Sequence, residues 1–357
     1  MRAMVSSLHG ANLSIATFLK QPTPWNSGVL GALCFSADAA KSQVADSGVP
    51  CLHVPMQSLD GADAACEVWR NSNALMQGQC DGVHYCHDDE VLFGVIALSE
   101  DMFEARADKT PLQHAAESAY SQVFALLDTL RFPYLFRFWN YFADINTHSF
   151  GLERYRQFNL GRRDAFIAHG RDIAGNFPAA CALGAAQGPL NIAFLAGRVA
   201  PLRIENPRQI SAYHYPRQYG PRSPMFSRAS LVCLKEAAVL FISGTASIVG
   251  HTSLHASDVL AQTRETLANI KSVLAEANRS SMQSQRGGAE FNLTDLNYRV
   301  YVRDPADLAR VRHELQQCVG NALKAVYLKA DVCRQDLLLE IEASAVQALV
   351  CAGGGQV

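Results

Sequence analysis

The chain has 357 residues and a formal net charge of −2, and 49% of its residues are hydrophobic. This length allows two domains or a few repeats of a smaller unit. With 31 basic and 33 acidic residues there is no global basic field, so composition gives no support for a protein that binds nucleic acid or an anionic membrane.

The ten cysteines are scattered through mostly apolar surroundings. They lack the paired short spacings of a zinc ribbon and the density of a secreted scaffold, so we expect reduced thiols. No apolar run reaches the roughly 18 residues that a membrane span requires. We therefore expect a cytoplasmic protein.

A first α+β unit is predicted over residues 83–198. The stretch VHYCHDDEVLFGVIAL (83–98) has two strand-like arms around a polar turn, and a helical pattern follows over 110–130. A strand within 134–146, a helix around 151–170 and a closing strand pair within 178–198 complete the unit.

The same order of elements returns from residue 229. A hairpin over 229–250 precedes a helix over 255–279, and a polar linker leads to a strand, a second helix over 305–319 and two last strands. We infer two similar halves, with domain bounds at 1–202, 203–228 and 229–357. The alternative is a chance match of common α+β elements. Residues 1–82 are expected to add a strand and a helix to the first half.

The segment between the halves is dense in Arg, Tyr and Pro and has no clear periodicity: RIENPRQISAYHYPRQYGPRSPMFSRAS, residues 203–230. Five arginines beside four aromatic side chains favour an ordered segment that binds an anion. The alternative is that these arginines cross-link the two halves through carboxylates.

The last predicted strand, LLLEIEASA (337–345), carries Glu340 and Glu342 on one face and apolar residues on the other. Pattern alone is typical of a half-buried strand with a solvated outer face. The other interpretation is a buried acid, and for Glu342 a solvated or salt-bridged carboxylate is favoured.

One polar cluster invites a metal-site hypothesis: His84, Cys86, His87, Asp88 and Asp89. Their crowding in a hairpin gives poor tetrahedral geometry, and no second ligand cluster accompanies them. A polar turn is the favoured interpretation.

Residues 229–349 resemble the YjgF-like, or reactive-intermediate deaminase, family. The resemblance rests on the hairpin, the helix DVLAQTRETLANIKSVLAEA and the terminal strand LLLEIEASA, in which the family's glutamate matches Glu340. The family's substrate-binding arginine falls on Ala325. Enamine and imine deamination are therefore not expected.

A longer resemblance is to the chorismatases. It rests on RFWNYFADIN, GLERYRQFNLGR, PAACALG, IENPRQISAYHYP, YGPRSPMFSRA, SGTASIVGH and ADVCRQDLLLEIE, spread over about residues 131–342. This resemblance implies an α+β protein with two YjgF-like halves, mixed sheets packed by helices and an active site in a cleft near the interdomain segment. It also implies an enzyme that cleaves chorismate and releases pyruvate without a cofactor or metal, as a monomer or trimer, in aromatic pigment or quinone synthesis.

The resemblance implies the site residues one by one. Glu340 matches the catalytic acid, which would protonate the enolpyruvyl methylene carbon. The implied substrate-binding residues are Arg154, Tyr155 and Arg163, with Tyr213, Tyr215 and Arg222 added from the interdomain segment.

Two positions separate the product branches of the family, and they correspond here to Cys333 and approximately Ala246. Cys333 resembles the hydroxybenzoate-forming branches, and alanine at the second position favours 3-hydroxybenzoate together with some 4-hydroxybenzoate. The alternatives are a hydrolytic chorismatase that forms a dihydroxycyclohexadiene carboxylate and a non-catalytic protein that binds aromatic acids. From the residues alone, Cys333 is a small buried hydrophobe.

Overall fold

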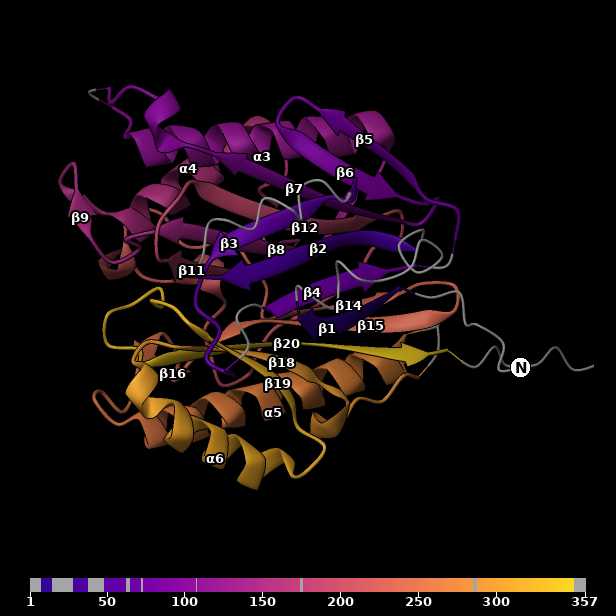
Figure 1. Cartoon of the computed structure of the whole chain (residues 1–357), viewed down its shortest axis with the longest axis vertical. Coiled ribbons are helices and arrows are strands. Elements are labelled where there is room, and N and C mark those ends of the chain that lie inside the picture. The colour runs from indigo at the N-terminus through magenta and orange to yellow at the C-terminus, as the bar shows by residue number, and fades with distance from the viewer. Residues whose placement is uncertain are drawn as a thin grey trace, which may run out of the picture.

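The computed structural model describes residues 8–14, 28–37, 48–61, 65–71, 73–106, 108–173, 176–284 and 288–349. In this part of the chain the long strands form two six-stranded sheets and one four-stranded sheet, with helices on the outside (Figure 1). None of the described helices is long and apolar enough to cross a membrane.

The first six-stranded sheet is built by the first predicted unit, in the order β11-β8-β12-β7-β6-β5. Strands β8 and β11 are parallel, because helix α4 lies between them in the chain, and the other pairs are antiparallel. Its strands are β5 (Met76–Cys80), β6 (Val83–His87), β7 (Val91–Leu98), β8 (Tyr134–Ala143), β11 (Ala179–Ala185) and β12 (Leu190–Gly197).

The second six-stranded sheet repeats this arrangement in the order β19-β18-β20-β15-β14-β13. Again the one parallel pair, β18 with β19, has a helix between its strands. Its strands are β13 (Leu202–Ile204), β14 (Ala229–Cys233), β15 (Ala237–Thr245), β18 (Asn297–Val302), β19 (Lys324–Lys329) and β20 (Leu339–Ala348). The prediction of an α+β protein with two similar halves is confirmed.

The sequence pattern of the first half predicts that its last two strands, β11 and β12, pair with each other. They do not, and the last two strands of the second half, β19 and β20, do not pair either. In the first sheet β8 separates β11 from β12, and in the second β18 separates β19 from β20. The parallel crossover through the helix places β11 and β19 at an edge, and the last strand then fills the centre. The domain bounds at 1–202, 203–228 and 229–357 stay a prediction.

Each sheet carries two helices on its outer face (Figure 1). Helices α3 (Pro111–Leu130) and α4 (Arg154–Ala168) cover the first sheet, and α5 (Val259–Gln283) and α6 (Leu308–Val319) cover the second. Helix α3 begins where the Thr110 side chain accepts a hydrogen bond from the Gln113 amide, with proline at the first helical position. Asp258 caps α5 in the same way.

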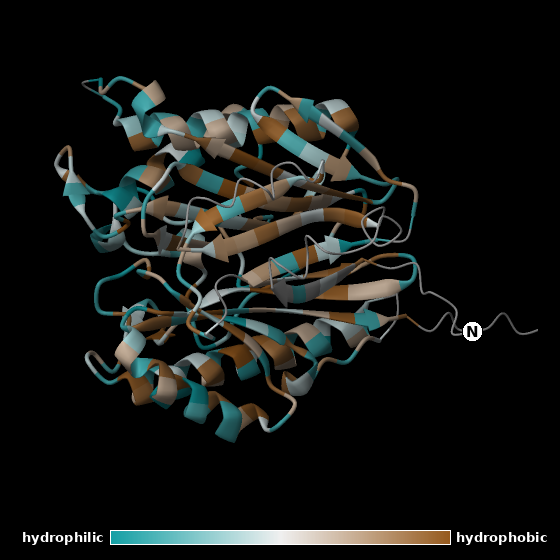
Figure 2. Ribbon diagram, in the orientation of Figure 1, coloured by the Kyte–Doolittle hydropathy of each residue, from teal (hydrophilic) through white to brown (hydrophobic). Residues whose placement is uncertain are grey.

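A third sheet lies between the two halves (Figure 1). It has the order β1-β4-β2-β3, with β1 (His9–Ser14), β2 (Val29–Ser36), β3 (Cys51–Pro55) and β4 (Ala65–Arg70). One apolar core joins residues of all three sheets, and the strands are accordingly brown along most of their length in Figure 2. The described part of residues 1–82 is thus largely a sheet, and the helix predicted there lies outside the described residues.

A disulfide joins Cys34 and Cys66, so the expectation that all cysteines are reduced is wrong for this pair. The two residues stand opposite each other on the antiparallel strands β2 and β4, with their Cα atoms 4.2 Å apart. Their separation of 32 residues in the sequence conceals this pairing, because it depends on strand register.

A buried ion cluster ties the three sheets together. The Glu342 carboxylate on β20 accepts hydrogen bonds from Arg137 on β8 and from Arg299 on β18, the latter at 2.6 Å from Nη1 to Oε1. Arg299 also pairs with Glu67 on β4. Because Arg137, Arg299 and Glu342 are each less than 5% exposed, removing one partner leaves a charge without compensation in the interior.

We expect Arg299→Ala to lower the free energy of unfolding by about 3–5 kcal/mol, because Glu342 and Glu67 both lose a buried partner. Urea denaturation measures the change. The matched control is Arg264→Ala, which removes an exposed arginine that pairs with Glu314, and which should leave the unfolding midpoint nearly unchanged. Equal effects of the two substitutions would contradict a structural role for the cluster.

Candidate active site

Glu340 stands where strand β15 departs from regular pairing with β20. Ile242 pairs with Ala343 and Thr245 with Ile341, so two residues of β15 face a single residue of β20 and the strand bulges. One of the two is Gly244, where a Cβ atom would lie 1.9 Å from Oε1 of Glu340. The glycine therefore provides the space that the carboxyl group occupies.

The Glu340 carboxyl is 4% exposed. Burial raises its pKa to about 8, and the negative charge of Glu342 acts in the same direction, whereas Arg137 and the Cys333 thiol lower it. At pH 7 this group is therefore mostly a neutral acid that can donate a proton.

Glu342 is also buried, on the same face of β20, but it has the opposite protonation state. Burial alone would raise its pKa, yet Arg137 and Arg299 bring the pKa below its ordinary value. The Tyr301 hydroxyl donates a further hydrogen bond to Oε1 at 2.9 Å. Of the two interpretations weighed for Glu342, the salt-bridged carboxylate is confirmed and the solvated one is wrong, because the other sheets cover this face.

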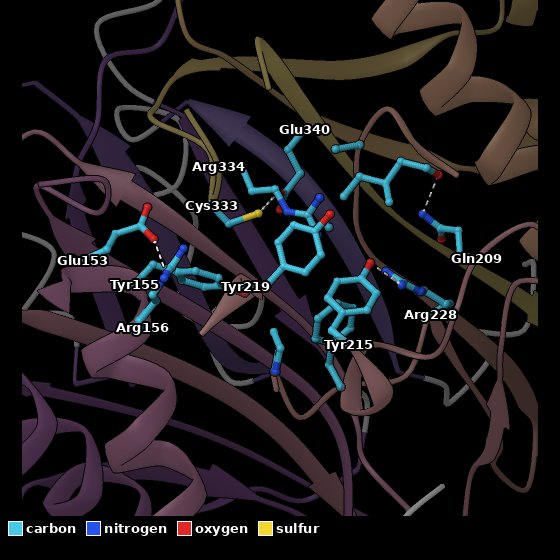
Figure 3. A pocket seen from close by; sticks show the side chains of 15 residues that line it. Glu153, Tyr155, Arg156, Gln209, Tyr215, Tyr219, Arg228, Cys333, Arg334 and Glu340 are labelled. Atoms are coloured by element: carbon cyan, nitrogen blue, oxygen red, sulfur yellow. Dashed lines mark hydrogen bonds and ion pairs between the residues drawn. The ribbon is translucent and has the colours of Figure 1, made fainter. Parts of the chain in front are cut away.

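Cys333 lies beside Glu340, in the loop between β19 and β20. Its Sγ atom is 3.9 Å from Oε2 of Glu340 (Figure 3). Burial, followed by the charge of Glu340, raises the pKa of the Cys333 thiol to about 12 although Arg334 opposes this. The side chain is therefore a neutral thiol near pH 7, without nucleophilic thiolate character.

One face of helix α4 lines the inner part of the site. Tyr155 and Arg162 are seven residues apart, or two helical turns, and both line a pocket with Cys333 and Glu340. Arg162 is 3% exposed and donates a hydrogen bond to Asn159 at 2.8 Å. Its buried Nε has no hydrogen-bond partner among the described residues.

The interdomain segment lines the outer part of the site (Figure 3). Tyr215 and Tyr219 lie with their ring centroids 5.6 Å apart, and the Arg334 guanidinium stacks 3.9 Å from the centroid of Tyr219. Arg228 donates a hydrogen bond to the Tyr215 hydroxyl at 2.8 Å. The predicted order in this segment is present as two short helical turns, Ala212–His214 and Arg217–Tyr219.

Together these elements enclose two adjoining pockets that share Tyr155, Phe226, Gly244, Cys333 and Glu340. The outer one has a volume of about 620 Å³, including space open to solvent, and the inner one about 310 Å³. Arg156, Arg228 and Arg334 line the outer pocket and Arg162 lines the inner one. Only Arg156 of these four has an ion pair within the described part of the chain, with Glu153 at 3.0 Å. Arg162 and Arg334 therefore bring positive charge to the site without a paired carboxylate, whereas Arg228 interacts electrostatically with Glu205.

The structure brings five of the nine predicted site residues together. Those that line the outer pocket are Tyr155, Tyr215, Ala246, Cys333 and Glu340.

The other four do not line either pocket. Arg154 binds the Glu100 carboxylate and the Ala143 carbonyl oxygen. Arg163 follows Arg162 on α4, about 100° further round the helix, and is absent from the lining of both pockets. Tyr213 packs against Phe177 with centroids 5.3 Å apart, and Arg222 is exposed.

Sequence reasoning missed the arginines that do line the pockets: Arg156, Arg162, Arg228 and Arg334. Arg162 carried a usable signal, since its spacing of seven from Tyr155 places both on one helical face. Arg228 and Arg334 had none, because their approach to the tyrosines depends on how the interdomain segment and the loop before β20 fold.

The polar cluster is only partly a turn: His84, Cys86 and His87 lie on strand β6, whereas Asp88 and Asp89 lie in the turn that leads to β7. Asp88 accepts hydrogen bonds from the amides of Glu90 and Val91, both at 2.7 Å, and from the side chain of Asn71 at 2.6 Å. Within the described ranges, no three His, Cys, Asp or Glu side chains group in a way that would hold a metal ion.

Comparison with known proteins identifies the family. The family described as "Chorismatase FkbO/Hyg5-like, N-terminal" matches residues 67–196. A 3-hydroxybenzoate synthase of Streptomyces hygroscopicus is 36% identical over 327 residues, which is 89% of this chain and 92% of that protein. The chain belongs to the chorismatase family.

Two further matches extend over most of this chorismatase-family chain. A chorismatase of Streptomyces hygroscopicus is 38% identical over 283 residues, covering 78% of this chain and 79% of that one. The crystal structure of a chorismatase aligns with a TM-score of 0.81 and 31% identity, over 96% of this chain and 99% of the other. The fold described above is therefore a chorismatase fold.

Proposed function

We propose that this member of the chorismatase family converts chorismate to pyruvate and 3-hydroxybenzoate, with some 4-hydroxybenzoate. One observation carries the proposal: a neutral, buried carboxyl group, Glu340, shares its pockets with the guanidinium groups of Arg162 and Arg334, which form no ion pair among the described residues. An acid beside free cations suits a substrate that is an anion and must be protonated on carbon. Relatives named 3-hydroxybenzoate synthase and chorismatase support the choice of chorismate.

The charge of the pocket matches chorismate, which carries a ring carboxylate and an enolpyruvyl carboxylate. Arg228 donates a hydrogen bond to the Tyr215 hydroxyl, and Arg334 donates one to the His251 carbonyl oxygen at 2.9 Å. Both guanidiniums are therefore oriented before substrate binds. Arg162 is the third cation without an ion pair in the described residues. We propose that these arginines bind the two carboxylates through charge-assisted hydrogen bonds.

Arg154 and Arg163 keep an indirect role in this proposal. Arg154, the first residue of α4, binds both Glu100 and the Ala143 carbonyl oxygen at the end of β8, and so it fixes the helix that presents Tyr155 and Arg162. Arg163 follows Arg162 on that helix. Neither is proposed to contact the substrate, because other side chains of α4 line the pockets.

Glu340 acts as the general acid. Its proton passes to the terminal methylene carbon of the enolpyruvyl group, which turns the enol ether into an oxocarbenium ion and leaves Glu340 as a carboxylate. That carboxylate then stabilises the adjacent cation. A carboxyl group with an ordinary pKa of about 4.3 would be ionised at pH 7 and could not begin the reaction.

The fate of the oxocarbenium ion decides the product. Capture by water gives the dihydroxycyclohexadiene carboxylate and pyruvate. Hydroxybenzoate and pyruvate together have the composition of chorismate, so this branch needs no net water, and the site must keep bulk water from the cation. Cys333 and Ala246 line the pocket beside Glu340, and we propose that they exclude water there.

Glu340→Gln should abolish pyruvate release from chorismate, with kcat falling by at least about 100-fold, because the amide cannot protonate carbon. Pyruvate formation is followed with purified protein, and chorismate binding is followed by calorimetry. The matched control is Glu153→Gln, which changes the other carboxylate of the outer pocket and should retain turnover.

Two outcomes would contradict this assignment. If the wild-type protein binds chorismate and releases no pyruvate, it is a binding protein. If Glu340→Gln keeps full turnover, another group is the acid.

Cys333→Ala should lower the aromatic fraction of the products while pyruvate release persists. The substitution opens space for water next to Glu340, and it leaves the acid in place. Chromatography of the products from wild-type protein and variant measures the ratio, with Cys318→Ala, a cysteine on α6 outside both pockets, as control. An unchanged product ratio would remove Cys333 as a determinant of the branch.

A further inference from the structure

Two buried glutamates stand two residues apart on one face of β20, and their surroundings differ completely. Glu342 is surrounded by donors: Arg137, Arg299 and the Tyr301 hydroxyl. Glu340 has only the weak Cys333 thiol as a hydrogen-bond partner in the described residues. Two carboxylates this close on one strand resist ionising together, so the one with more hydrogen-bond donors, Glu342, takes the charge.

We propose that Glu342, held as a permanent carboxylate by Arg137 and Arg299, is a positioning residue that keeps Glu340 protonated in the free enzyme. This inference deepens the proposed function and rests on it. Glu342 does not line either pocket that contains Glu340, so it would act through its charge and not through contact with substrate.

The permanence of the charge on Glu342 follows from its partners. Both carboxylate oxygens are bound by guanidiniums, Oε2 by Arg137 and Oε1 by Arg299. Arg137 donates a second hydrogen bond, 3.1 Å long, to the Ile242 carbonyl oxygen, which holds its guanidinium next to the bulge. A proton on Glu342 would have to displace one of these donors, and it would leave a buried cation without its partner.

Glu340 faces charged or titratable groups on several elements. Cys333 and Arg334 lie in the loop before β20, and Tyr155 and Arg162 come from α4. Burial raises the pKa of Tyr155 well above its ordinary value, so its hydroxyl stays neutral.

Further groups face Glu340 from the interior. Cys181 on β11 and Tyr301 on β18 are neutral because burial raises the pKa of each. Arg137 on β8 is the cation that opposes protonation of Glu340, and Glu342 is the anion that favours it. Arg228 and Arg156 complete the charged lining of the outer pocket, together with Glu153. Glu342 is thus the one anion on the interior side among the described residues that bear on Glu340.

The consequence appears in the basic limb of the pH profile. Activity requires protonated Glu340, so kcat/KM should fall as the pH rises through the pKa of about 8 of the free enzyme. Removing the charge of Glu342 lowers that pKa and leaves Arg137 uncompensated, so the limb moves to lower pH. Removing the charge of Arg137 has the opposite sign, so the limb moves to higher pH.

The experiment measures kcat/KM for chorismate from pH 5.5 to about 9.5 in four proteins. Glu342→Gln should shift the basic limb down by about one pH unit or more, and Arg137→Gln should shift it up. Glu67→Gln is the matched control, because it also deprives Arg299 of a carboxylate partner. Glu67 is partly exposed and does not act on Glu340, so the basic limb of this variant should stay in place. If kcat/KM falls at the same pH in the wild-type protein and in every variant that folds, the proposal is overturned.

A second measurement needs neither substrate nor a variant that folds. Neutron diffraction from wild-type crystals at pH 7 should place deuterium on the Glu340 carboxyl and none on Glu342. Deuterium on Glu342 would overturn the inference even where the protein is active. A wild-type protein that shows this protonation pattern and releases no pyruvate would instead contradict the proposed function alone.

Discussion

Buried ion pairs around Glu342 join all three sheets. A carboxylate from the second sheet is shared by Arg137 of the first sheet and Arg299 of its own, and Glu67 of the third sheet completes the cluster. Buried charges of this kind are costly unless every partner is present, so the cluster fixes how the three sheets meet. The pocket that contains Glu340 is lined by residues of both halves and of the segment between them, and by none of the third sheet among the described residues.

Strand β20 carries the charged Glu342 and, two residues away, the neutral acid Glu340. This is possible because β15 bulges at Ser243 and Gly244, which leaves room for the Glu340 carboxyl without giving it a strong donor. Glycine is required there because a Cβ atom would overlap the carboxyl oxygen. Local backbone irregularity, desolvation and a neighbouring charge thus act together on one group.

Much of this arrangement could be predicted from the sequence. Periodicity gave the helices and most strands, and the repeated order gave the two halves, because such patterns report which face of an element is buried. Glu340, Tyr155 and Cys333 were predicted from the resemblance of several sequence motifs to the chorismatases. Arg154 and Arg163 were expected at the substrate, whereas the face of α4 that carries Arg162 lines the pocket, since one residue along a helix turns a side chain by about 100°.

Other features could not be predicted because they depend on long-range register. The Cys34–Cys66 disulfide requires the pairing of β2 with β4, and the burial of Glu342 requires a sheet from residues that have no clear pattern. Arg334 reaches Tyr215 and Tyr219 only when the interdomain segment folds against the loop before β20. Such contacts join residues that are distant in the chain, and local sequence contains little information about them.

The central claim is that Glu340 delivers a proton from its own carboxyl group to the methylene carbon of the enolpyruvyl group. The most direct test is a single turnover of chorismate by enzyme equilibrated in D2O, with the pyruvate methyl group analysed by mass spectrometry before it exchanges with solvent. Because a carboxyl proton exchanges with water, Glu340 carries deuterium in D2O and should transfer one deuterium to each pyruvate methyl group. A methyl group without deuterium, whose third hydrogen comes from the ring of chorismate, would contradict it.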